Sequence, residues 1–170
     1  MNNKFPPFSA RIGINTGNVL IGNIGSEQRM NFTAIGDGVN IAARIEGLCK
    51  FYHTEILITE NTFECVKNKI LCRKLDRVIV KGKEQPIIIF EPIEFIENAS
   101  SDQHILCSKF DQVLNHLWNN NFNNALQLLI ELSLLFPKDK PSKILFERIN
   151  EIISLPGEEV NSEFITFHDK

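Results

Sequence analysis

Two polar side chains four residues apart, Asn40 and Arg44, have the types and the spacing to bind a phosphorylated sugar. Apolar residues recur at helical spacing over 39–50, so a helix is predicted there and both side chains leave it on one face. They lie in its first turns, where free N–H groups and the helix dipole favour an anion. An amide and a guanidinium placed this way could hold a sugar edge and a phosphate. A capped amphipathic helix with a solvated polar face is the commoner explanation of this spacing.

The elements that must position these side chains are short strands that alternate with helices over residues 8–95. Apolar runs between Gly, Asn and Asp predict strands at 10–15, 19–24, 56–58, 73–80 and 86–92. Asp37 is the N-cap candidate of the helix that carries Asn40 and Arg44, because a short acidic side chain can accept hydrogen bonds from the free N–H groups of a first turn. Three apolar side chains of that helix are expected to face the core: Ile41, Ile45 and Leu48.

The pattern changes in the second part of the chain. Residues 105–153 have apolar side chains three and four apart and almost no glycine, which predicts helices only. The polar stretch at 97–102 predicts a linker. The expected segments are a mixed unit at 1–95, a linker at 96–104, a helical tail at 105–155 and a flexible C-terminus at 156–170. The predicted fold class is α+β, with a small all-α tail.

The bulk composition is typical of a soluble protein. The 170 residues carry a net charge of −3, which argues against nucleic-acid or membrane binding, since both favour a basic surface. No run reaches the roughly 20 apolar residues of a membrane helix, and no signal peptide is predicted. We expect a cytoplasmic chain. Its cysteines lack zinc or CxxC spacing and are expected to be isolated, buried thiols: Cys49, Cys65, Cys72 and Cys107.

Two ordered motifs resemble the core signature of class III adenylate and guanylate cyclases. They are RIGINTG at residues 11–17 and IGDGVNIAARIE at residues 35–46, and the similarity continues through VKGK at 80–83 to the strand that ends at Phe90. The resemblance implies that residues 1–95 are the C-terminal half of such a catalytic domain. It also implies a truncated ferredoxin-like sheet, because the first strands of the family's domain would be absent.

The resemblance implies roles for four residues. Asn40 would orient the ribose, and Arg44 would stabilise charge on the transferring phosphoryl group. Lys81 would bind the triphosphate. Thr33 is at the base-selecting position, where Asp or Thr is found in adenylate cyclases and Cys in guanylate cyclases, so ATP is the expected substrate. Without the resemblance, Lys81 is a solvated charge between two strands and Thr33 an ordinary strand threonine.

The expected metal site is where the sequence departs from the family. Class III cyclases use Mg²⁺ or Mn²⁺ held by two aspartates from the N-terminal half of the domain. Only ten residues precede Arg11, so neither aspartate is expected in this chain and no metal ligand is predicted. A sheet without its first strands would also leave an open edge and an exposed apolar face.

The helical tail has a weaker resemblance of its own. Phe122-Asn123-Asn124-Ala125, with Pro137 twelve residues after Ala125, is similar to the second half of a tetratricopeptide repeat. The tail as a whole resembles that of multidomain bacterial cyclases. One repeat cannot form a solenoid, so the helices are expected to pack on the cyclase region or on a partner.

These patterns leave three interpretations. The first is a fragment of a bacterial adenylate cyclase, a lyase that makes cyclic AMP and pyrophosphate from ATP; alone it would be inactive, and a second subunit or half-domain would supply the metal aspartates. The second is a non-catalytic module that binds and regulates a full-length cyclase, or a guanylate cyclase fragment. The third is a split reading frame. A full-length parent could be membrane-anchored.

Overall fold

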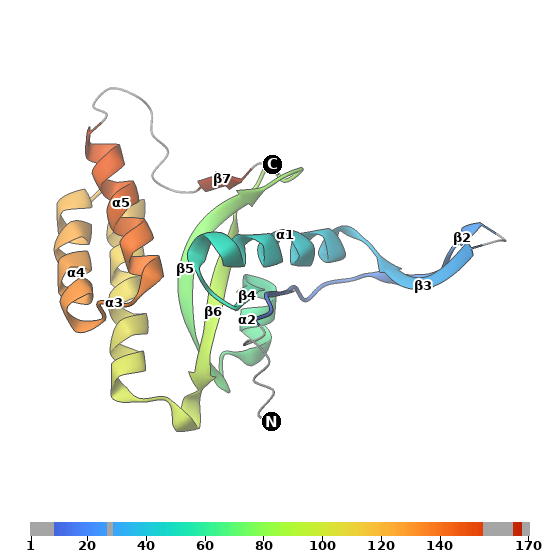
Figure 1. The fold of residues 1–170 in the computed structure, drawn as a ribbon, viewed down its shortest axis with the longest axis horizontal. Helices are drawn as coiled ribbons and strands as arrows, with labels where there is room; N and C mark the ends of the chain where they lie inside the picture. Colours follow the sequence, from blue (N-terminus) through green and yellow to red (C-terminus); the bar gives the residue numbers. More distant parts are fainter. Residues whose placement is uncertain (1–8, 27–28, 155–164, 168–170) are drawn as a thin grey trace, which may run out of the picture.

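The computed structural model describes residues 9–26, 29–154 and 165–167. It combines a mixed sheet with helices, which confirms the predicted α+β class (Figure 1). The elements in chain order are β1 (Ile12–Ile14), β2 (Leu20–Ser26), β3 (Arg29–Ile35), α1 (Asp37–Tyr52), β4 (Ile56–Thr59), α2 (Glu60–Val66), β5 (Ile70–Val80), β6 (Ile87–Phe95), the 3₁₀ helix η1 (Ile96–Asn98), α3 (Ser101–Trp118), α4 (Phe122–Leu135), α5 (Lys140–Ser154) and β7 (Ile165–Phe167).

The main sheet has five strands in the order β1-β4-β6-β5-β7. β1 pairs with β4 in parallel, whereas β6 is antiparallel to both β4 and β5. β5 and β6 form a long antiparallel hairpin, with irregularities after Leu71 and Lys74 that bend it. The short strand β7 pairs in parallel with the end of β5. Within the described residues β1 and β7 are therefore the edges of this sheet.

β2 and β3 form a separate hairpin that projects away from the rest of the molecule (Figure 1). β3 is not one of the strand ranges predicted from the sequence, although Thr33, which lies in it, is interpreted there as a strand threonine. The apolar side chains of β3 are not buried, since Met30, Phe32 and Ile35 are all more than 45% exposed. The hairpin projects away from the other elements, so among the described residues no neighbouring element covers these side chains (Figure 1).

One hydrophobic core joins the cyclase-like region to the helical tail. Its fully buried side chains come from α1, β4, β5, β6, α3, α4 and α5, and include Tyr52, Leu75, Leu114 and Leu145. As predicted, Ile45 and Leu48 of α1 are buried in this core, and Ile41 packs against it. The helices of the tail thus cover the sheet and do not form a core of their own.

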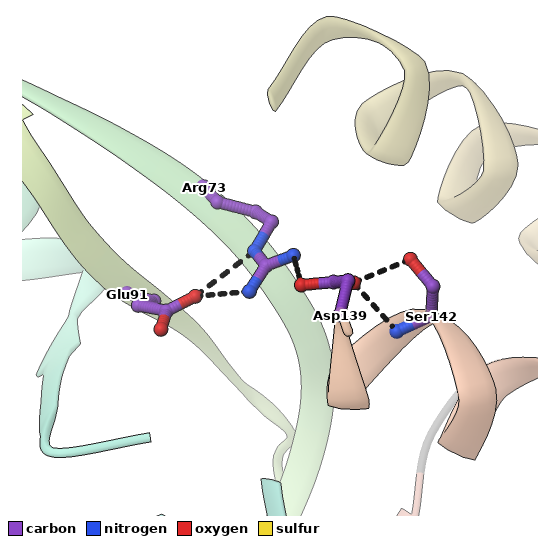
Figure 2. A network of polar contacts seen from close by, with 4 residues as sticks. All are labelled: Arg73, Glu91, Asp139 and Ser142. Carbon is purple, nitrogen blue, oxygen red and sulfur yellow. Dashed lines mark hydrogen bonds and ion pairs between the residues drawn. The ribbon is translucent and has the colours of Figure 1, made fainter. Parts of the chain in front are cut away.

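A buried polar network fixes the start of α5 to the sheet (Figure 2). The Arg73 guanidinium on β5 donates hydrogen bonds to Glu91 on β6 and, at 2.7 Å, to Asp139 before α5. The other carboxylate oxygen of Asp139 accepts hydrogen bonds from the Ser142 backbone N–H and hydroxyl. Because Arg73 is only 3% exposed, its charge depends on these two carboxylates.

Some ranges differ from those expected. η1 and the first residues of α3 occupy most of the predicted linker at 96–104, where Ser100 and Gln103 form a capping box. Within the range expected to be flexible, residues 165–167 form β7 instead, because they pair with β5; the rest of that range lies outside the described residues. Among the described helices, none is both long and apolar enough to cross a lipid bilayer.

Candidate functional site

α1 carries two of the predicted site residues, and its first turn is not capped as predicted. The N-cap is Gly36, whose φ of 152° is a conformation that favours glycine, and no side chain caps the helix. Asp37 is the first helical residue, and its carboxylate forms an ion pair with Lys83 in the turn between β5 and β6. The N-cap prediction for Asp37 was therefore wrong, because its carboxylate is used between elements.

An asparagine that the sequence reasoning gave no role holds the start of α1 in place. The Asn15 amide nitrogen donates a hydrogen bond to the Gly38 carbonyl at 3.1 Å, and its amide oxygen accepts one from the Thr59 hydroxyl at 2.8 Å. Asn15 thus ties the first turn of α1 to the ends of β1 and β4. The sequence feature that could have pointed to Asn15 is that it lies in the first cyclase-like motif, and its partner Gly38 in the second.

The middle of α1 rests directly on β1. A Cβ atom at Gly13 would lie 2.2 Å from the Ala42 carbonyl oxygen and 2.5 Å from the Glu46 nitrogen, distances that no side chain can occupy. Glycine at this position therefore allows α1 to approach the strand closely. This contact sets how far Arg44, between the two contact points, stands from the sheet.

Two of the predicted residues, Arg44 and Lys81, line one cavity of about 650 Å³. Lys81 begins the turn after β5, and a Cβ at Gly82 would lie 3.8 Å from an Arg44 guanidinium nitrogen, so the turn and the guanidinium are neighbours. Lys50 and His53 also line this cavity, with an apolar wall that includes Phe51 and Phe167. The three basic side chains Arg44, Lys50 and Lys81 make the cavity suited to a polyanion.

The other two predicted residues lie outside this cavity. Asn40 is exposed on the first turns of α1, one helical turn before Arg44. Thr33 is exposed on the projecting hairpin, where it pairs with Gly22. The structure therefore brings Arg44 and Lys81 together, places Asn40 on the same helix, and leaves Thr33 apart from them.

The described residues do not fit a divalent metal. Among them, no group of three or more His, Cys, Asp or Glu side chains is arranged to hold an ion. The buried carboxylate Asp76 and the partly buried Glu91 instead form ion pairs with Arg148 and Arg73, respectively. Each of these carboxylates is thus already paired with a cation of the protein, and within the described part of the chain no third acidic, His or Cys ligand is grouped with it.

Comparison with known proteins identifies relatives over most of the chain. The family model described as "Adenylate and Guanylate cyclase catalytic domain" matches residues 1–91, which is more than half of the 170 residues. An adenylate cyclase of Dictyostelium discoideum, described as terminal-differentiation specific, is 35% identical over 85% of this chain and 7% of its own length. The adenylate cyclase of Anabaena cylindrica is 44% identical over 51% of this chain and 18% of its own. The chain thus spans less than a fifth of these relatives.

Solved structures show a more limited likeness. The adenylyl cyclase CyaB from P. aeruginosa has a TM-score of 0.48 and 34% identity, and the match covers 58% of this chain and 49% of that one. The guanylate cyclase domain of RhGC from Catenaria anguillulae, in complex with GTP, has a TM-score of 0.42 and 29% identity, over 50% of this chain and 44% of that one. Because both scores are low, the family assignment rests on the sequence matches.

Proposed function

Because this chain belongs to the adenylate and guanylate cyclase catalytic-domain family, we propose that it supplies the substrate-binding side of an adenylate cyclase site. The reaction is the conversion of ATP to cyclic AMP and pyrophosphate. The observation that carries the proposal is the shared cavity of Arg44 and Lys81, because two cations that converge from a helix and a turn suit a triphosphate.

In this proposal each side chain acts on a different part of the nucleotide. Lys81 binds the triphosphate, and Arg44 stabilises the charge that develops on the transferring phosphoryl group. Asn40, exposed one turn earlier on α1, orients the ribose. Thr33 contacts the adenine. Since Thr33 lies apart from the cavity, a bound nucleotide would have to bridge from the cavity to the hairpin, or the hairpin would have to approach the site on assembly.

The proposed active unit includes a partner. The family's divalent metal, Mg²⁺ or Mn²⁺, would activate the 3′-hydroxyl and neutralise the triphosphate when bound. The described residues do not fit that metal, so a second cyclase subunit or half-domain is proposed to supply its ligands. This chain's own contribution is to bind and orient ATP, and the chain alone is proposed to be inactive.

The test is an assay of the purified chain with MnATP, alone and mixed with an N-terminal cyclase half. We expect turnover only in the mixture. Arg44→Ala should lower kcat about 100-fold, because it removes charge stabilisation in the transition state. Lys138→Ala, at an exposed lysine in the helical tail, is the control and should leave kcat unchanged. Turnover by the chain alone, or turnover in the mixture that ignores Arg44, would contradict the proposal.

A second candidate function is favoured by the exposed apolar hairpin, which suits binding to another protein. In that case the chain is a non-catalytic module that binds and regulates a full-length cyclase. The same variants separate the two functions. A regulator would retain partner binding and modulation after Arg44→Ala, whereas a substrate-binding subunit would retain binding and lose turnover.

Comparing MnATP with MnGTP, before and after Thr33→Cys, tests the choice of base.

A further inference from the structure

Asp76, on β5, is a fully buried carboxylate that connects three elements. One oxygen accepts hydrogen bonds from the Tyr52 hydroxyl at 3.1 Å and from Arg148 at 2.8 Å, and the other accepts one from the Arg77 backbone N–H at 2.8 Å. Burial raises the pKa of Asp76, and the positive charge of Arg148 opposes this shift. The carboxylate is thus satisfied by groups from α1, β5 and α5 together.

Tyr52 links this network to the proposed site. It is the last residue of α1, it is 1% exposed, and it follows Arg44 by eight residues on the same helix. A helix rises 1.5 Å per residue, so Tyr52 is about 12 Å from Arg44 along the axis. The middle of α1 is fixed where it rests on Gly13. With its first turn held by Asn15 and its middle by Gly13, α1 has a third fixed point at Tyr52. The three points together define where Asn40 and Arg44 point.

Arg148 links the network to the helical tail. It lies on α5, its side chain is 12% exposed, and it pairs with the fully buried Asp76. The start of α5 is independently fixed to β5 and β6 through Asp139 and Arg73. α5 therefore contacts the sheet at two points, through Asp139 at its start and through Arg148 further along the helix. The first contact limits how far Arg148 can move away from Asp76.

From this geometry we propose that Asp76 and Arg148 are positioning residues, through which the helical tail holds α1 and its residues Asn40 and Arg44 in place. The catalytic role of Arg44 rests on the proposed function, but the mechanical link does not. The matched region of the family ends at residue 91, so Arg148 lies outside it. In this proposal the helical tail helps to orient α1 and the two side chains, Asn40 and Arg44, that are proposed to bind the substrate.

The first test measures amide hydrogen exchange in the full-length chain and needs no nucleotide. Arg148→Met, which leaves Asp76 without its cation, should speed exchange at residues 48–52 about tenfold, with little change in β6. Arg148→Lys, which keeps the charge, should restore part of the protection. Lys109→Met, at an exposed ion pair between α3 and α4, is the control. Unchanged exchange at 48–52, or equal acceleration throughout the chain, would overturn the proposal.

The second test uses the mixture with an N-terminal cyclase half. Arg148→Met should lower kcat roughly fivefold with little change in KM, because a displaced Arg44 loses alignment with the reacting phosphoryl group. In an Arg44→Lys background the same substitution should cause no further loss, whereas equal losses in both backgrounds would show that Arg148 does not act through Arg44. If the wild-type mixture has no turnover, the proposed function fails, and the exchange measurement still decides the mechanical link.

Discussion

At the residue scale, the polar side chains around α1 divide by exposure. Asn15 is satisfied inside the fold by Gly38 and Thr59, whereas Asn40 is exposed. A side chain that serves the fold finds its partners in the protein, while one that serves a ligand must leave its hydrogen-bonding groups accessible. Asn15 therefore has the environment of a structural residue, and the role of the exposed Asn40 in ligand binding remains a prediction.

The cysteines are also distinguished by burial, and only part of the prediction for them holds. All four are free thiols; Cys49 is buried, but Cys65 is exposed. Burial raises the pKa of Cys72 and of Cys107 to about 11. At pH 8 about one in a thousand of these two thiols would then be the reactive thiolate.

We therefore predict that one thiol reacts rapidly with a chromogenic disulfide reagent in the native protein at pH 8, and that this thiol is Cys65. The other three should react only when the protein opens, because they are buried or partly buried. Cys65→Ser should abolish the fast phase, and Cys107→Ser should leave it intact. A fast phase that survives Cys65→Ser would contradict the prediction.

At the element scale, the close contact between α1 and β1 predicts opposite effects of alanine at two glycines. Gly13→Ala should destabilise the chain by about 2 kcal/mol, because the added methyl collides with the α1 backbone. At Gly47, in α1, an added methyl group would meet no atom within 4 Å, so Gly47→Ala should stabilise by about 1 kcal/mol through helix propensity. Urea unfolding measures both changes, and equal effects of the two substitutions would contradict this account.

The anchoring of α5 makes a second prediction at this scale. Asp139→Ala removes one of the two carboxylates that satisfy the buried Arg73, and also removes the hydrogen bonds to Ser142. We expect a loss of about 3 kcal/mol in the free energy of unfolding. Glu131→Ala is the matched control, because its ion pair with Lys109 is largely exposed and should contribute less than about 0.5 kcal/mol. A similar loss in both variants would argue against a structural role for the buried network.

At the scale of the whole molecule, the projecting hairpin β2–β3 leaves large apolar side chains uncovered by the described residues. Leu20 and Phe32 are 71% and 75% exposed, and a two-stranded hairpin alone is marginally stable in water. Ile21 and Phe32 occupy one face of the hairpin by register, and Leu20 and Ile35 the other. Both faces therefore offer apolar surface, as expected of strands that are covered on both sides in an assembly.

We predict that the hairpin drives self-association. Phe32→Ser should shift the sedimentation profile toward the monomer at a given concentration, because it removes a large exposed apolar side chain. Leu134→Ser is the control, since Leu134 on α4 is similarly exposed, at 78%, but lies away from the hairpin. If the two substitutions reduce association equally, general surface hydrophobicity and not the hairpin would be responsible.

Much of this protein was predictable from the sequence. The α+β class, most strands and the helix that carries Asn40 and Arg44 follow from local patterns, because burial on one face imposes a period on the apolar residues. The cyclase family could be identified from ordered motifs within residues 11–90. The roles assigned to Asn40, Arg44, Lys81 and Thr33 remain predictions.

Only the tertiary structure decided how the parts are joined. Sequence patterns carry no direct record of contacts between distant residues, so they missed the Asp37–Lys83 ion pair and gave Asn15 no role. They left open whether the helical tail packs on the cyclase-like region or on a partner, whereas in the structure the tail and the sheet share one core and the buried carboxylate Asp76. The physical reason is that a buried charge is satisfied by whichever partners the packing brings within hydrogen-bonding distance, however far apart they are in the chain.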